Sequence, residues 1–543
     1  MKRNVIEAGA MDAGKVILVA TLFALGACAE ASGPVAPVGQ AEVGGAGGGV
    51  GGGGAPDAAS LRARAREASG YSDRALGQGV QLTGSTTMLG APHEAQVLVG
   101  PGGDFLMEVR GPLGLSRCVT RGTAWTRDIG GETRMLHLGE RDEAVLQALF
   151  VSGAWVDDAR LSFTAGTGVG TLAFALADSP VRGTVTLDAA SGRVTRAEWR
   201  AAGGAKADVM EFSGAVSHGG VHFPGVVQIT SANGSSTTTT FSRAEDAPTF
   251  IRSPYAPVMA YGDVRFDAAK AATLELKRAK TGHLLCRPLV NGKQFDWFFF
   301  DTGAGGTILT PEVIDALALE RFGQVPVSGI GEGMMSSFVR AESIEVGPVA
   351  MTGALATEID LSFVANAIGE KVSGIVGFNL LSRCIAEIDQ NGGVVKLHDP
   401  AVFLASEEAR GLTWSRLVTY ERHPCVEASF EGHTGFFKLD TGAAGSSVSI
   451  HAPAVTRLEL LKGRETKDTR IGGVGGMRSA KKGTLAWFEL GGVRTESVEA
   501  TFATESAGAF DDPYTLGNIG GDLMEPFVLV LDYQRERIAF RRR

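Results

Sequence analysis

Two apolar runs in the second half of the chain each lead into the same tetrapeptide. Residues 295–300 and 435–439 are rich in aromatic and aliphatic side chains, and Asp-Thr-Gly-Ala follows directly at 301–304 and at 440–443. Runs of this composition and length are typical of buried strands. We therefore expect Asp301 and Asp440 to lie where a buried strand ends.

The surroundings of the two tetrapeptides repeat as well, at an offset of 139 residues. Thr310 and Pro311 predict a helix start, followed by helix to residue 319, and Ser449 is expected to open the counterpart. Each copy then continues with a glycine-rich hairpin tip, an apolar-Gly segment and a strand. These are predicted at 329–333, 375–381 and 384–389 in the first copy, and at 471–476, 518–524 and 527–532 in the second.

The first half of the chain shows a different pattern. After a charged helical stretch at 60–69, short apolar strands alternate with turns of Gly, Asn and Asp, and 221–231 with 236–241 predict one hairpin. This length can bury its own core, and no catalytic constellation occurs in it. We expect a β-rich accessory domain at 59–265, joined through a charged, solvated linker at 266–281.

The first 58 residues indicate where the protein works. Lys2, Arg3 and Lys15 precede an apolar run at 16–27, which is too short for a mature membrane span and is typical of a secretory signal. Met11 is an alternative start. Residues 28–58 consist largely of Gly, Ala, Pro and Val and predict a flexible tether.

Charge and cysteine content exclude several classes of protein. The formal net charge is −9, and no basic stripe with interleaved aromatics is present, so nucleic acid is not an expected partner. The arginines at 541–543 are expected to face solvent. Five cysteines make no disulfide framework, although a bridge from Cys286 to Cys425 stays open if both lie near one axis. The nine histidines are scattered, and no spacing suggests a metal site.

Residues 282–405 and 406–543 resemble the two lobes of retropepsin-like (retroviral-type) aspartic proteases, fused in tandem. In that family each lobe supplies one Asp-Thr-Gly loop and one apolar-apolar-Gly loop, and the lobes face each other across a pseudo-twofold cleft. The resemblance implies a mainly β, bilobal, pepsin/retropepsin-like double-ψ fold, and a monomer with an internal pseudo-dimer. Asn518 departs from the pattern, because the second lobe usually has an apolar residue there.

The resemblance also assigns roles to residues. The two threonines are expected to hydrogen-bond across the lobe interface, and the glycines beside them to let backbone amides approach the carboxylates. The implied site consists of the catalytic pair Asp301 and Asp440, the supporting residues Thr302, Gly303, Thr441, Gly442, Gly377 and Gly520, and the flap candidates Gly331, Gly333, Gly473 and Gly475.

Two carboxylates in this arrangement define a chemistry. When about 3 Å apart they share one proton, so that one acts as base towards a water molecule while the other polarises the scissile carbonyl. No metal or organic cofactor is required. Ala304 and Ala443 stand where similar enzymes carry a hydroxyl donor to a carboxylate. Its loss should raise the pKa of the pair and favour mildly acidic to neutral pH.

Two further resemblances concern the first half. The tetrapeptide from Leu25 to Cys28 resembles the lipobox of bacterial lipoproteins, which implies cleavage before Cys28 and lipidation there; a plain signal peptide with an incidental cysteine is the alternative. Ala29 favours the outer membrane by the same resemblance. The accessory region weakly resembles the half-barrel of outer-membrane lipoprotein carriers. It is expected either to bind lipid, acylated protein or substrate, or to act as a spacer or cover for the cleft.

We therefore expect an aspartic endopeptidase of the bacterial cell envelope, lipid-anchored at the membrane and acting on a peptide or protein substrate. Two alternatives remain open: a peptide-binding pseudoprotease, and a lipid-handling carrier that acts through the accessory domain. A lone Asp-Thr-Gly can also be an ordinary turn after a strand. The repeated surroundings argue against two such coincidental turns.

Overall fold

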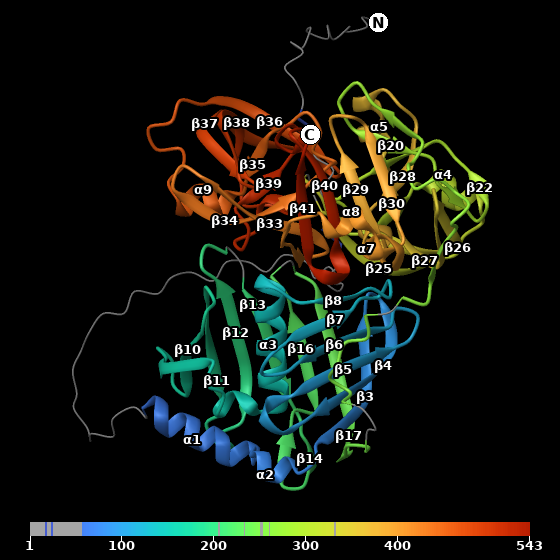
Figure 1. The fold of residues 1–543 in the computed structure, drawn as a ribbon. Coiled ribbons are helices and arrows are strands. Elements are labelled where there is room, and N and C mark those ends of the chain that lie inside the picture. The colour runs from blue at the N-terminus through green and yellow to red at the C-terminus, as the bar shows by residue number, and fades with distance from the viewer. Residues whose placement is uncertain are drawn as a thin grey trace, which may run out of the picture.

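A computed structural model describes residues 57–543, apart from 205–206, 233, 250–252, 260 and 331–332, together with two short strands, β1 (Ile17–Leu18) and β2 (Phe23–Ala24). The prediction of a mainly β chain is confirmed. Figure 1 shows a β-rich domain below two lobes that lie side by side. The predicted tether, Cys28 and the rest of the leader lie outside the described residues.

The accessory domain is built on a 13-stranded sheet in which every neighbouring pair is antiparallel, in the order β8-β7-β6-β5-β4-β3-β17-β16-β13-β12-β11-β10-β9. Its helices are α1 (Ala58–Ser69), α2 (Asp73–Leu76) and α3 (Leu138–Ser152). Its strands are β3 (Val80–Met88), β4 (Ala91–Val99), β5 (Phe105–Arg110), β6 (Leu115–Val119), β7 (Ala124–Arg127), β8 (Thr133–Met135), β9 (Leu161–Ala165), β10 (Thr171–Leu176), β11 (Val181–Leu187), β12 (Val194–Ala201), β13 (Asp208–Ser213), β14 (Val216–His218), β15 (Val221–Phe223), β16 (Val226–Thr230) and β17 (Ser236–Asp246).

Helix α3 provides much of the core of this domain, and it was not predicted from the sequence. Its residues 144–146 and 148–152 are buried, and Phe150 packs against Phe174 and Trp199 of the sheet. A helix that is apolar on nearly every side loses the 3.6-residue pattern and resembles a strand in sequence. The predicted hairpin arm at 221–231 is also divided, because Pro224 cannot donate to a ladder; β15 pairs with β14, and β16 pairs with β17.

The two lobes have the same strand connectivity. In each, the strand before the Asp-Thr-Gly motif pairs in parallel with the strand of the apolar-Gly segment, as β23 does with β28 and β34 with β39. The first lobe contains β18 (Val264–Phe266), β19 (Leu276–Arg278), β20 (Leu284–Cys286), β21 (Leu289–Val290), β22 (Lys293–Gln294), β23 (Trp297–Phe300), β24 (Thr307–Leu309), α4 (Pro311–Ala316), β25 (Arg321–Ser328), β26 (Met334–Val346), β27 (Val349–Glu358), α5 (Ser362–Ile368), β28 (Val372–Val376) and α6 (Phe378–Leu381).

The second lobe repeats this series around its own motif. Its strand order, β36-β37-β38-β35-β39-β34-β33-β32, follows that of the first lobe element by element. It contains β32 (Val418–Tyr420), β33 (His423–Phe430), β34 (His433–Leu439), β35 (Val448–Ile450), α9 (Ala452–Arg457), β36 (Lys467–Gly473), β37 (Gly476–Leu490), β38 (Val493–Ala503), β39 (Gly517–Ile519) and α10 (Gly521–Met524).

A five-stranded sheet joins the lobes, in the order β30-β29-β40-β41-β31. Strand β29 of the first lobe pairs antiparallel with β40 of the second, with Glu387 opposite Val530. The labels of these strands lie between the two lobes in Figure 1. The elements are β29 (Ile385–Asp389), β30 (Val394–His398), α7 (Pro400–Ala405), α8 (Glu407–Arg410), β31 (Trp414–Arg416), β40 (Phe527–Asp532) and β41 (Arg537–Arg542).

Two local predictions are wrong. Helix α4 ends at Ala316 rather than at residue 319, and the Thr310 side chain does not cap it. Ser449 lies inside β35, and the counterpart helix begins at Ala452 after His451, because the second copy has two more residues at this point. Of the C-terminal arginines, Arg542 and Arg543 are exposed as expected, whereas Arg541 is half-buried and binds Glu387 at 2.6 Å and Glu408 at 2.7 Å.

The predicted linker and the possible disulfide bridge also differ from what the structure contains. The segment expected as a linker supplies β19 and the end of β18 to the sheet of the first lobe. Cys118, Cys286, Cys384 and Cys425 are free and buried, so the open possibility of a bridge is not realised. In the part of the chain that the structure describes, no helix has the length and apolar character needed to cross a membrane.

Candidate active site

The two aspartates lie at the ends of equivalent strands and face each other across the lobe interface. Asp301 follows β23 and Asp440 follows β34, and both side chains are fully buried. The backbone amides of Gly303 and Gly442 both donate to Asp301 Oδ1, at 2.7 and 3.1 Å. One carboxylate is therefore held by a loop from each lobe.

Glycine is required at the third motif position on both sides. A Cβ atom on Gly303 would collide with the Asp440 carboxylate, and one on Gly442 would collide with that of Asp301. Gly377 and Gly520 are equally constrained, because a Cβ on either would clash with the backbone of its own lobe, at Gly306 and at Ser446. These contacts leave no room for a larger residue behind either aspartate.

Thr302 and Thr441 exchange hydrogen bonds between the lobes. The backbone amide of each donates to the hydroxyl oxygen of the other at 3.0 Å. The hydroxyls in turn donate to the opposite strand, Thr302 to Leu439 O at 2.8 Å and Thr441 to Phe300 O at 3.1 Å. This symmetrical set fixes the separation of the two loops.

The carboxylates influence each other's protonation directly. Burial raises the pKa of Asp301 well above its usual value, and the charge of Asp440 and a hydrogen bond to that residue raise it further, against the two backbone amides that lower it. Two buried carboxyls in contact cannot both be ionised at low cost, so the pair holds one proton over a wide pH range.

Two buried histidines that sequence reasoning missed support the loops from the opposite lobe. His283 Nε2 lies 3.0 Å from Gly442 O, and His423 Nε2 lies 3.0 Å from Gly303 O. Since a carbonyl can only accept, each Nε2 carries the proton. Burial lowers the pKa of His423 to about 3, so it remains neutral. In the sequence, the two histidines are 140 residues apart, one residue more than the 139 that separate the two motifs.

Asn518 holds Asp440 from a direction that has no equivalent in the first lobe. Its Nδ2 donates to Asp440 Oδ2 at 3.1 Å, and its Oδ1 lies 2.9 Å from His451 Nε2. Thr515 Oγ1 lies 3.1 Å from the other His451 nitrogen and donates to Asp512 at 2.6 Å. Asn518, which departs from the family pattern, is therefore a hydrogen-bond donor to the second aspartate. It belongs to a buried chain of polar side chains.

This chain ends at a fully buried lysine two residues before the second aspartate. Lys438 forms ion pairs with Asp512 at 3.0 Å and Glu421 at 3.2 Å. Burial and the charge of Lys438 act in opposite directions on Asp512, and its pKa is lowered. A buried lysine is stable only with such partners, so this cluster ties β34 to the segment that positions Asn518.

The two glycine-rich hairpins, expected to be flaps, meet at their tips. They are formed by β25 with β26 and by β36 with β37. Ile330 of the first tip is fully buried in a cluster with Ala443 and Ile471, and its carbonyl accepts from Arg478 Nε at 3.2 Å. Of the flap candidates, Gly475 lies in the second tip, Gly473 ends β36, Gly333 is exposed, and Gly331 lies outside the described residues.

Each flap carries one added strand. β1 pairs in parallel with β36, Ile17 opposite Ile471, and β2 pairs antiparallel with β25, Ala24 opposite Val327. Backbone pairing of this kind is how an extended peptide is bound by strand addition. Each flap edge can thus accept an extended chain by backbone pairing.

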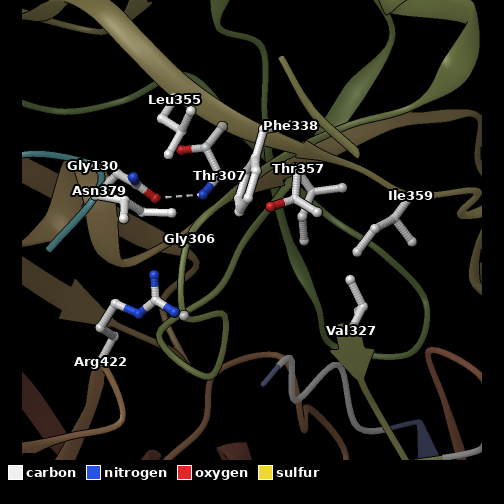
Figure 2. A pocket seen from close by; sticks show the side chains of 13 residues that line it. Gly130, Gly306, Thr307, Val327, Phe338, Leu355, Thr357, Ile359, Asn379 and Arg422 are labelled. Atoms are coloured by element: carbon white, nitrogen blue, oxygen red, sulfur yellow. Dashed lines mark hydrogen bonds between the residues drawn. The ribbon is translucent and has the colours of Figure 1, made fainter. Parts of the chain in front are cut away.

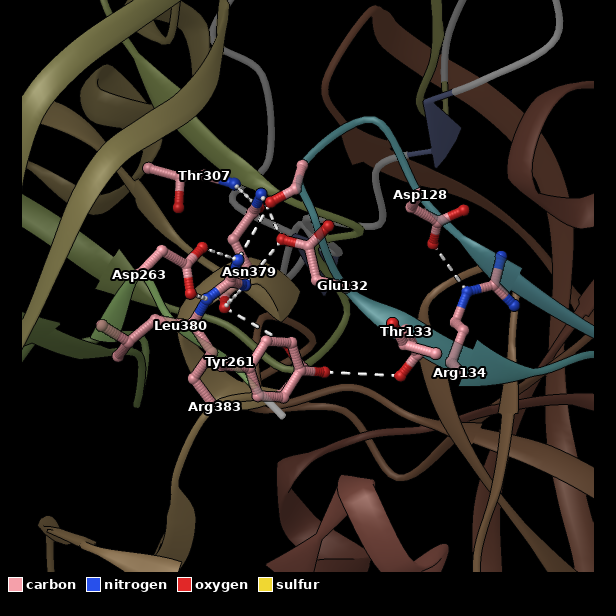
Figure 3. Close-up of polar contacts among 12 residues, drawn as sticks. Asp128, Glu132, Thr133, Arg134, Tyr261, Asp263, Thr307, Asn379, Leu380 and Arg383 are labelled. Atoms are coloured by element: carbon pink, nitrogen blue, oxygen red, sulfur yellow. Dashed lines mark hydrogen bonds and ion pairs between the residues drawn. The ribbon is translucent and has the colours of Figure 1, made fainter. Parts of the chain in front are cut away.

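The accessory domain reaches the back of the first catalytic loop. Asn379 Oδ1 accepts from the Thr307 amide at 2.6 Å, and Asn379 Nδ2 donates to Glu132 Oε1 of the accessory domain at 3.1 Å. Arg383 pairs with the same Glu132 atom at 2.7 Å and also with Asp263. Figure 3 shows Glu132 between Asn379 and Arg383. The loop after Asp301 is therefore braced from outside its own lobe.

Two β lobes with matching connectivity, each presenting an Asp-Thr-Gly loop at a shared axis beneath paired hairpins, define the aspartic protease class. Residues 288–380 and 426–523 match the family model described as aspartyl protease, and these segments contain both motifs. The chain therefore carries an aspartyl protease domain in two segments, as the resemblance in sequence predicted.

Among solved structures, the chain is similar to a LolA superfamily protein from Nitrosomonas europaea, with 12% identity and a TM-score of 0.28, over 36% of this chain and 96% of that one. It is also similar to a retropepsin-like aspartic protease from Rickettsia conorii, with 18% identity and a TM-score of 0.18, over 24% of this chain and 94% of that one. No curated protein matches the chain.

Proposed function

We propose that the protein is an aspartic endopeptidase that hydrolyses peptide bonds with water activated between Asp301 and Asp440. The observation that carries this proposal is the contact of two fully buried carboxyls across the axis, with the pKa of Asp301 raised by burial and by Asp440. Such a pair supplies an acid and a base at one place.

The surrounding contacts support an assignment of roles. Asn518 donates to Asp440, which favours the ionised form of that carboxyl, while the raised pKa of Asp301 favours its protonated form. Asp440 then takes a proton from water, the water oxygen attacks the scissile carbonyl carbon, and Asp301 donates its proton to the carbonyl oxygen. Collapse of the tetrahedral intermediate returns a proton to the leaving amine.

The test uses the full chain and a diverse peptide library, beside Asp301→Asn and Asp440→Asn. Each variant should lose at least about 10³-fold in kcat/KM, because the amide that replaces the carboxyl can act neither as the acid nor as the base. Asp178→Asn, on an exposed turn of the accessory domain, is the matched control and should retain activity. Equal cleavage by the wild type and both active-site variants would sink the proposal. Binding without any cleavage would favour the pseudoprotease instead.

We also propose that the protein is a lipoprotein of the cell envelope, with lipid on Cys28, an accessory domain at 59–265 and lobes at 282–405 and 406–543. The leader pattern and the sequence before Cys28 support this. Mass spectrometry of membrane-extracted protein should find a diacylated N-terminal cysteine, and Cys28→Ser should release the protein from membranes. An unmodified Cys28 in the membrane fraction would contradict the anchor.

A further inference from the structure

A small cavity of about 20 Å³ lies beside the first catalytic loop, where three parts of the chain meet. The accessory domain contributes Ile129 and Gly130, the first lobe contributes residues 305–308 and the flap residue Val327, and the second lobe contributes Arg422. Figure 2 shows Arg422 extending into the space beneath Gly306 and Asn379. The volume admits about one water molecule or one small polar group.

Arg422 is buried there without a direct partner. The residue is 8% exposed and stands in the two-residue turn between β32 and β33. Among the residues that the structure describes, none makes a hydrogen bond or an ion pair with its guanidinium. A buried cation is destabilising unless an anion or acceptor meets it, so this one indicates a binding site.

The acidic side chains that act on Arg422 bind other arginines, although the buried Oε2 of Glu132 has no hydrogen-bond partner among the described residues. Asp128 binds Arg134 at 2.8 Å, Glu140 binds Arg134 at 2.6 Å, and Glu132 binds Arg383 at 2.7 Å. Burial lowers the pKa of Arg422, and the charges of these carboxylates oppose that shift from longer range. Because an arginine keeps its proton at physiological pH, its donors remain available to a ligand that enters the cavity.

A strand paired with the edge of the first flap lies next to this cavity. β2 pairs with β25 so that Ala24 is opposite Val327, and Val327 lines the cavity. Gly305 and Gly306 form the facing wall and carry no side chains that could fill it. Ile129, Phe338 and Ile308 add apolar walls, and Thr307, Thr357 and Asn379 add polar groups. A charge pair formed in this small, partly apolar space is stronger than one in bulk water.

We propose that this cavity is a substrate subsite for an acidic side chain, in which Arg422 pairs with a Glu or Asp carboxylate and the accessory domain supplies one wall. The subsite rests on the proposed peptidase function and gives it a substrate class: peptides with a carboxylate on the first-lobe side of the scissile bond. Arginine suits this role because its fork can hold both carboxylate oxygens.

The test compares peptides that are identical except for Glu, Gln or Leu at each position near the scissile bond, with the full chain and with Arg422→Gln and Arg422→Lys. At one position the wild type should prefer Glu over Gln by at least about tenfold in kcat/KM. Arg422→Gln should abolish that preference, so that the Glu and Gln peptides are cleaved with equal kcat/KM. Arg422→Lys should keep part of the preference for the Glu peptide.

Failure of the subsite and failure of the peptidase are distinguishable. If the wild type cleaves Glu and Gln peptides equally at every position, or if the preference survives in Arg422→Gln, the subsite is wrong and the peptidase stands. If nothing is cleaved, the affinity of the Asp301→Asn protein for the same Glu and Gln peptides tests the subsite alone. Tighter binding of the Glu peptide, lost in the Arg422→Gln double variant, supports it, and equal binding overturns it.

Discussion

At the scale of single residues, the two aspartates of the proposed catalytic pair are not equivalent, although their motifs are identical. Asp301 accepts two backbone amides, whereas Asp440 accepts the side chain of Asn518. The motif itself was predictable, because it repeats within matching surroundings. The role of Asn518 was not, because it depends on His451, which is 67 residues away in the sequence and had no pattern of its own.

Replacing Asn518 by Leu should shift the acid side of the pH profile. Without this donor the ionised form of Asp440 is less stable, so its pKa rises. The active, singly protonated pair then forms only at higher pH, and kcat/KM should fall at the acid end of the profile. The alkaline side, where Asp301 loses its proton, should move less. The measurement is kcat/KM between about pH 3 and 9.

The control for this variant is Asn366→Leu, an exposed position on α5 that should leave the profile unchanged. An unchanged acid limb in Asn518→Leu, with normal folding, would show that Asn518 does not set the protonation of Asp440.

At the scale of elements, the order of strands and turns in the two lobes followed from the repeat, but the sheet that joins the lobes did not. Its central pair, β29 and β40, comes from segments about 140 residues apart, and nothing in either segment indicates the other. Glu387 of β29 binds Lys396 of β30 at 3.0 Å and Arg541 of β41 at 2.6 Å. One carboxylate thus links three strands of this sheet.

Glu387→Gln should destabilise the joining sheet at neutral pH and reduce the acid sensitivity of folding. His398, Lys396 and Arg541 lower the pKa of Glu387 from 4.5 to about 2. A lowered carboxyl pKa stabilises the fold above the unfolded value, and this contribution is lost as pH falls from about 4.5 towards 2. We expect a loss of about 1–3 kcal/mol at pH 7 by chemical denaturation.

Glu408→Gln provides the comparison, because Glu408 also binds Arg541 but is 45% exposed. It should change the free energy of unfolding by less than about 1 kcal/mol. Equal effects of the two substitutions would mean that burial of Glu387 does not matter to this sheet.

At the scale of the whole molecule, the accessory domain and the lobes share a buried polar interface. Arg383 is 2% exposed and has one carboxylate partner in the accessory domain, Glu132, and another in the segment before the first lobe, Asp263. Sequence reasoning found both parts but treated them as separable. The contact between Asn379 and Glu132 joins positions 247 residues apart, and no local pattern predicts it.

A chain shortened to residues 266–543 should therefore be less stable and less active than the full chain. It retains both aspartates but leaves Arg383 without Glu132 and Asp263, and a buried charge that loses its partners costs about 3–5 kcal/mol. We expect a lower thermal midpoint and a reduced kcat/KM on the same peptide.

Arg383→Met in the shortened chain is the informative control, because it removes the orphaned charge and should recover part of the stability. A shortened chain as stable and active as the full one would show that the interface is only a surface contact.

His283 and His423 each link one half of the repeat to the aspartate loop of the other half. His283 of the first lobe binds a loop carbonyl of the second, and His423 of the second binds the matching carbonyl of the first. A substitution at either histidine therefore disturbs the loop of the opposite lobe. A change at this position in one lobe therefore requires a compatible loop in the other, so the two lobes are not independent of each other.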